Sequence, residues 1–164
     1  MTMRFGIITL SDRSSRGERE DLSGPALASF LQTENCSVLK QLILPDDELL
    51  LRQTLAEWAD SDHLDVILTT GSTGFAPRDI APEATRAIIQ KEAPGLAELM
   101  RMESLKKTKH AALSRAVVGI RTRTIIINLP GSPKGAVENL QFIFSVLPHA
   151  VQLLHDDPNS EASH

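Results

Sequence analysis

Short apolar runs alternate with segments of helical periodicity along most of this chain. The runs that we expect to form strands are residues 5–10, 38–44, 65–70, 117–121 and 124–128, the last two joined by a tight turn. The expected helices cover residues 25–31, a segment from 46–47 through Trp58, 82–90, 95–102 and a long segment from Pro133 that Pro148 divides. This order predicts an α/β fold, a three-layer doubly wound and mostly parallel sheet with helices on both faces.

One domain accounts for this pattern. No repeat or linker interrupts the alternation, and 164 residues is within the usual size of a single domain. We therefore expect one domain over residues 1–155, followed by a disordered tail over the polar, aperiodic residues 156–164.

Composition excludes several classes of function. The net charge of -4 gives no general attraction to nucleic acid or anionic membranes, and no apolar segment reaches the length of a membrane span. Cys36 is the single cysteine, which rules out an intrachain disulfide and favours a reducing compartment. Because the N-terminus also lacks the pattern of a signal peptide, we expect a cytoplasmic protein.

A loop of small residues, TTGSTGFAPRD at 69–79, directly follows the apolar run at 65–70. At the carboxyl end of a parallel strand such a loop leaves backbone N–H groups free to bind phosphate oxygens, and ligands of open α/β sheets gather at this edge. Its glycine spacing matches neither a Walker A loop nor a dinucleotide fingerprint. An ordinary strand-to-helix turn explains the glycines equally well. The candidate phosphate-binding residues are Gly71, Ser72, Thr73 and Gly74.

Two aspartates are candidates for a metal site at the same edge. Asp46 follows the strand at 38–44, and Asp79 ends the small-residue loop. Two carboxylates placed there could share Mg²⁺, which takes oxygen ligands and often bridges to substrate phosphates. For Asp46 a helix N-cap is the stronger interpretation from its position alone. Asp79 is less easily explained as a cap, because Ala81 directly precedes Pro82.

Two further polar segments follow predicted strands. NLPGSPKG at 128–135 is a second loop of the phosphate-binding type, with Gly131, Ser132 and Lys134 as candidates. Lys134 in a first helical turn opposes the helix dipole, which an anionic ligand or simple exposure to solvent would explain. Ser11-Asp12-Arg13 forms a third cluster after residues 5–10. The histidines have no zinc-ligand spacing and no Gly-x-Ser-x-Gly motif is present, so phosphate chemistry is favoured.

The string TTGSTGFAPRDIAPEAT resembles the signature of the molybdopterin adenylyltransferases, the MogA/MoaB family, which includes the gephyrin G domain. ITLSDRSSRGEREDLSGPAL, LPDD, SLKKTKHAALSRAVVGIR and NLPGSPKG resemble further segments of that family and occur in its order. The resemblance covers residue 4 to about residue 154. The chain differs from the family at one position of this loop. The family usually has TTGGTG, and Ser72 replaces the second glycine. A serine there either crowds a backbone that needs positive φ or adds a hydrogen bond to phosphate.

The resemblance implies a homotrimer, or a hexamer as in some MoaB-type members. It also implies a reaction in which ATP, with Mg²⁺, adenylylates molybdopterin and releases pyrophosphate, and a MoeA-type molybdenum insertase as partner. By motif, Asp46 and Asp79 match the two functional aspartates and residues 71–74 match the phosphate loop. The implied substrate-binding residues are Ser11, Asp12, Arg13, Glu98, Ser104, Ser114 and Arg115.

Two other functions remain open from the sequence. A MoaB-type protein could bind molybdopterin or scaffold a partner without transferring AMP, but such a binder needs no pair of metal carboxylates. A nucleotide-processing protein like the competence-damage family would hydrolyse ATP or a sugar nucleotide without any pterin. The Asp46/Asp79 pair favours the transferase.

Overall fold

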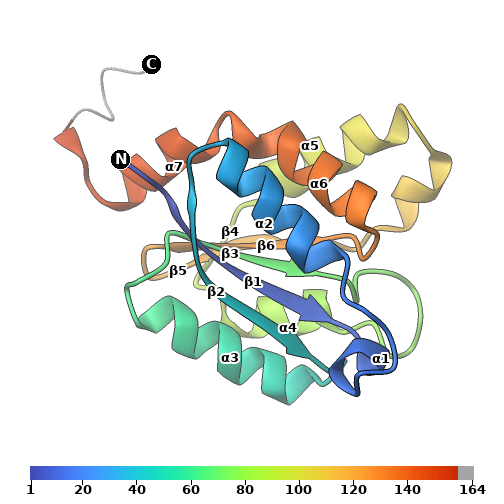
Figure 1. The fold of residues 1–164 in the computed structure, drawn as a ribbon. Helices are drawn as coiled ribbons and strands as arrows, with labels where there is room; N and C mark the ends of the chain where they lie inside the picture. Colours follow the sequence, from blue (N-terminus) through green and yellow to red (C-terminus); the bar gives the residue numbers. More distant parts are fainter. Residues whose placement is uncertain (159–164) are drawn as a thin grey trace.

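The computed structural model describes residues 1–158, in which a six-stranded sheet lies between two layers of helices (Figure 1). The strands are β1 (Arg4–Leu10), β2 (Ser37–Leu44), β3 (Val66–Thr70), β4 (Lys91–Glu92), β5 (Val118–Arg121) and β6 (Thr124–Leu129). Their order is β2-β1-β3-β6-β5-β4; the first four are parallel, and β5 is antiparallel to both of its neighbours. The predicted three-layer, mostly parallel α/β sheet is confirmed, as is the β5–β6 hairpin.

The helices divide between the two faces of the sheet. They are α1 (Asp12–Ser15), α2 (Ser23–Thr33), α3 (Glu48–Asp60), α4 (Ala81–Ile88), α5 (Pro94–Leu105), the 3₁₀ helix η1 (Lys109–Leu113), α6 (Pro133–Phe144) and α7 (Leu147–Leu154). Helices α2, α5, α6 and α7 cover one face, and α3 and α4 cover the other (Figure 1). No helix within residues 1–158 is long and apolar enough to cross a membrane.

Side chains of β1 alternate between the two cores, as strand geometry requires. Phe5 and Ile7 pack in the core beneath α2 and α6, and Ile8 and Leu10 pack in the core against α3. Gly6 lies between them, where a Cβ atom would come within 2.9 Å of the Trp58 ring. A side chain at position 6 would therefore push α3 away from the sheet.

Helix α3 corrects the capping interpretation of Asp46. The N-cap is Asp47, whose carboxylate accepts a hydrogen bond from the Leu50 N–H at 2.9 Å. Asp46 is left outside the helix and free for another role. Ala81 is likewise not the cap of α4, because that helix begins after Ile80 without a side-chain cap.

Three short elements were not predicted from the sequence. Ser11 accepts a hydrogen bond from the Ser14 N–H and starts the one-turn helix α1, where we expected only a loop. β4 and η1 have two and five residues, too short for periodicity to reveal. The break between α6 and α7 confirms the division predicted near Pro148, which lies in the first turn of α7. Of the tail predicted to be disordered, residues 159–164 lie outside the described residues.

Candidate active site

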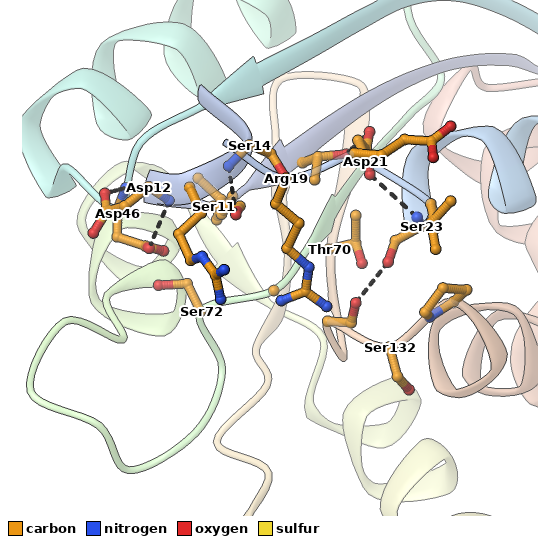
Figure 2. A pocket seen from close by; sticks show the side chains of 18 of the residues that line it. Ser11, Asp12, Ser14, Arg19, Asp21, Ser23, Asp46, Thr70, Ser72 and Ser132 are labelled. Atoms are coloured by element: carbon orange, nitrogen blue, oxygen red, sulfur yellow. Dashed lines mark hydrogen bonds between the residues drawn. The ribbon is translucent and has the colours of Figure 1, made fainter. Parts of the chain in front are cut away.

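A cavity of about 670 Å³ opens at the carboxyl edge of the parallel strands (Figure 2). The loops that follow β1, β2, β3 and β6 all contribute to its wall, because the carboxyl ends of parallel strands meet at one edge. Of the residues singled out in the sequence, its lining contains Ser11, Asp12, Arg13, Asp46, Gly71, Ser72, Asp79, Gly131 and Ser132. Four segments that are far apart in the chain are thus brought to one site.

Asp12 and Asp46 are linked by a reciprocal pair of hydrogen bonds. The Asp46 N–H donates to Asp12 Oδ1 at 2.8 Å, and the Asp12 N–H donates to Asp46 Oδ2 at 3.3 Å (Figure 2). Burial raises the pKa of Asp46, and the nearby Asp12 charge raises it further, while hydrogen bonds from Ser72 and the Asp12 backbone and the charge of Arg78 oppose the shift. Two carboxylates that lie side by side and partly out of water suit a cation.

The loop after β3 begins with two residues in the left-handed region. Gly71 has φ +98°, and a Cβ there would lie 2.6 Å from the Leu10 carbonyl oxygen, so only glycine fits. Ser72 has φ +61°. Its hydroxyl accepts a hydrogen bond from the Ile80 N–H at 2.8 Å, and its single hydrogen has two alternative acceptors, the Arg78 carbonyl at 3.3 Å and the Asp46 carboxylate. The serine that departs from TTGGTG therefore ties the start of the loop to its end.

Asp79 closes the same loop from within. Its Oδ2 accepts a hydrogen bond from the Ala76 N–H at 2.9 Å while the side chain lines the cavity. A Cβ on Gly74 would lie 2.9 Å from this oxygen, so a glycine lets the carboxylate pack against the turn. The carboxylate thus has one oxygen engaged with the loop and one available to a ligand.

Arg115 supports this loop from outside the cavity. Its guanidinium donates to the Gly74 carbonyl at 2.7 Å and the Asp79 carbonyl at 3.0 Å, and it forms an ion pair with Glu83. Burial raises the pKa of Glu83, but hydrogen bonds from Arg115 and from the Glu83 backbone, together with the charges of Arg115 and Arg86, make the net shift downward. Arg115 thus braces the loop, and its predicted contact with substrate stays a prediction.

A second cavity of about 370 Å³ lies on the other side of the loop and shares Ser132 with the first. Thr73 and Gly74 line it, so the two halves of the glycine loop face different cavities. Ser104 and Ser114 also line it, which brings two more of the predicted residues near the site. Ser132 caps α6 by accepting a hydrogen bond from the Gly135 N–H at 3.1 Å.

Besides Arg115, two predicted residues line neither cavity. Lys134 is 88% exposed, and its ammonium lies 3.9 Å from Glu138 in the next turn of α6, as in a surface ion pair. Glu98 is exposed on α5. Simple exposure to solvent, the other interpretation of Lys134, agrees with this placement.

Several residues of the cavity wall were missed by the sequence reasoning. Asp21 accepts hydrogen bonds from the Thr9 hydroxyl at 2.8 Å and from the Ser23 and Gly24 N–H groups at 3.1 Å. The Ser23 hydroxyl in turn donates to the Gly131 carbonyl at 2.6 Å (Figure 2). The sequence does contain a signal for Asp21, because Asp-x-Ser-Gly before an apolar helix is a capping pattern. Arg16, Arg19, Arg78 and Thr70 are further lining residues without such a signal.

A doubly wound sheet with a glycine loop, carboxylates and arginines around one cavity at its carboxyl edge defines an α/β protein built to bind a phosphorylated ligand. The sequence model of a family described as "Probable molybdopterin binding domain" matches residues 6–149. The chain belongs to this family.

The relatives of this chain include proteins of molybdenum cofactor synthesis. A Helicobacter pylori protein named molybdopterin adenylyltransferase is 43% identical over 93% of this chain and 88% of its own length. The Drosophila melanogaster molybdenum cofactor synthesis protein cinnamon is 45% identical over 95% of this chain, but this chain spans only 26% of that protein. The crystal structure of the molybdopterin biosynthesis enzyme MoaB from Thermus thermophilus is 50% identical, with a TM-score of 0.89 over 96% of this chain and 99% of that one.

Proposed function

We propose that this chain is a molybdopterin adenylyltransferase, which transfers AMP from ATP to molybdopterin and releases pyrophosphate. The observation that carries the proposal is the convergence of the Gly71–Ser72 loop with the carboxylates of Asp12, Asp46 and Asp79 on one cavity. The name of the H. pylori relative supports the same activity, because the two chains align over nearly their whole length.

The carboxylates fit Mg²⁺. Within residues 1–158 no group of three or more His, Cys, Asp or Glu side chains is arranged to hold a metal ion. Mg²⁺ is usually bound by one or two carboxylates together with waters and substrate phosphates, so a protein cage is not needed. We propose that Asp46 and Asp79 hold the ion, with Asp12 orienting Asp46 through the reciprocal hydrogen bonds. The bound ion supplies positive charge to the phosphate oxygens.

The reaction is an in-line displacement at the α-phosphorus of ATP. An oxygen of the terminal phosphate of molybdopterin forms the new bond, and the bond to the β-phosphate oxygen breaks with its electron pair on pyrophosphate. Backbone N–H groups of the loop bind phosphate oxygens, and Arg115 keeps that loop in place through Gly74 and Asp79. A phosphate nucleophile is already ionised at neutral pH, so alignment and charge provide most of the catalysis.

A mass-spectrometric assay tests the proposal directly. The purified protein is mixed with molybdopterin and Mg-ATP, and adenylylated pterin and pyrophosphate are measured. Product that requires both Mg²⁺ and pterin supports the transferase. Pterin binding without product would instead identify a binding or scaffolding module, and ATP hydrolysis without pterin would identify a nucleotide-processing enzyme.

We also propose a cytoplasmic homotrimer, or a hexamer, that passes its product to a MoeA-type insertase. These statements rest on the family resemblance. The edge strand β2 adds support for self-association, because Leu39, Leu42 and Ile43 are 38–52% exposed on it. Light scattering of the purified protein measures the assembly.

A further inference from the structure

Three arginines of this chain lack an internal partner within the described residues, and all three line the large cavity. The chain has eleven arginines. Eight of them bind carboxylates or backbone carbonyls through their guanidinium groups. Within residues 1–158 the guanidinium groups of the other three form no hydrogen bond or ion pair: Arg13, Arg19 and Arg78. Arginines that are unpaired only where they border a cavity indicate an anionic ligand for that cavity.

Arg19 is the most isolated of the three. The charge of Arg78 acts on Asp46, and the charge of Arg13 acts on Glu18. Of the acidic residues beside Arg19 in sequence, Glu18 pairs with Arg16, and Asp21 binds Thr9 and the start of α2. Glu20 lines the same cavity but forms no ion pair with Arg19. No side chain within the described residues therefore forms an ion pair with the guanidinium of Arg19.

The side chain of Arg19 extends across the cavity. Figure 2 shows it reaching from the segment between α1 and α2 in the direction of Thr70 and Ser132, away from the Asp12–Asp46 pair. Thr70 ends β3, where its hydroxyl donates to the Pro130 carbonyl at 2.7 Å, and Ser132 starts α6. One wall of the cavity thus carries carboxylates for a metal ion, and another carries an unneutralised guanidinium beside two phosphate-type loops.

We propose that Arg19 binds the pyrophosphate portion of ATP and holds the leaving group of the transfer. When the bond from the α-phosphorus to its bridging oxygen breaks, the electron pair stays on that oxygen, and the guanidinium donates hydrogen bonds to the pyrophosphate. No proton transfer or further reactant is needed. The inference rests on the proposed function, and it assigns the leaving-group end of the cavity to a residue that is not among the site residues predicted from the sequence.

The test is a binding measurement on the intact protein with three probes: ATP, inorganic pyrophosphate and AMP. R19Q keeps a polar side chain but removes the charge, and Arg19 is exposed, so we expect the variant to unfold at the same temperature as the wild type. Loss of one charge-assisted contact should weaken pyrophosphate and ATP binding about tenfold or more and leave AMP binding unchanged. R16Q is the matched control, because Arg16 lines the same cavity but already pairs with Glu18.

Each result decides the assignment. Unchanged pyrophosphate binding in R19Q, or no pyrophosphate binding by the wild type, would overturn it. An equal loss for AMP and pyrophosphate would overturn it as well, because it places the arginine at the α-phosphate or at the phosphate of the pterin. Arg19-dependent pyrophosphate binding in a protein that forms no adenylylated pterin would refute the transferase and leave the anion site standing. An active transferase that R19Q does not alter would refute the arginine alone.

Discussion

Replacing Ser72 by glycine sets two contributions to stability against each other. The left-handed backbone at φ +61° costs a serine about 1 kcal/mol, which glycine does not incur. Glycine also gains more freedom in the unfolded chain, which removes about 0.5–1 kcal/mol of that advantage. The backbone change by itself is therefore close to neutral.

The hydroxyl decides the sign. Without it, the Ile80 N–H loses its acceptor at 2.8 Å, and the weaker bond to the Arg78 carbonyl at 3.3 Å is lost as well. An unsatisfied, partly buried N–H costs about 1–3 kcal/mol, so S72G should be about 1–2 kcal/mol less stable than the wild type. For a chain of this size that lowers Tm by roughly 2–8 °C.

Urea and thermal unfolding of wild type, S72G and S72A measure this difference. S72A should be the least stable of the three, because it keeps the left-handed strain and loses both hydrogen bonds. A stability order with S72G at or above the wild type would refute the view that the hydroxyl holds the loop closed. S72G restores the sequence TTGGTG that is usual in the family, so we expect the variant to retain transferase activity.

Three further predictions concern the site, the core and the opposite edge of the sheet. D79N should abolish AMP transfer while leaving molybdopterin binding largely intact, because only the metal carboxylate is removed; near-normal turnover in the mass-spectrometric assay would remove that role from Asp79. N128A should cost roughly 2–4 kcal/mol in urea unfolding, since the fully buried amide of Asn128 accepts from the Val117 N–H and donates to the hydroxyls of Thr69 and Thr85. Asp65 should make the protein acid-sensitive: burial raises its pKa, but hydrogen bonds and the charge of Arg4 outweigh that and lower it, so stability present above its ordinary value of about 3.8 is lost as the pH falls below it. D65N should flatten this part of the stability–pH curve, and an unchanged curve would contradict the assignment.

The architecture was predictable because it depends on local patterns. Each buried strand leaves an apolar run in the sequence, and the alternation with helices predicts parallel pairing without any long-range information. Helix boundaries were less predictable at acidic pairs. Asp46 and Asp47 both fit an N-cap by residue type, and only the backbone shows that Asp47 caps α3 while Asp46 turns toward Asp12.

The site was predictable where a motif follows a strand and unpredictable where a side chain crosses the cavity. The Gly71–Ser72 loop and Asp46 lie at strand ends, so the sheet itself brings them together. Arg19 lies in an irregular segment, and its sequence neighbours Glu18 and Glu20 suggest a solvated charge cluster. Whether an arginine is paired depends on where its neighbours point, which no periodicity encodes.

Residues at the amino ends of the strands and residues at their carboxyl ends have different roles, the first in stability and the second in ligand binding. Asp65 precedes β3 at its amino end, where it binds both Arg4 and His155, the latter at 3.0 Å, whereas the loop from Gly71 begins at its carboxyl end. Five residues of strand place the two ends about 16 Å apart. A charge change at Asp65 is thus beyond about one screening length from the cavity at physiological salt. D65N should therefore change acid unfolding without changing pyrophosphate affinity at neutral pH, and R19Q should do the reverse. A change of pyrophosphate affinity in D65N, or of acid unfolding in R19Q, would contradict this separation.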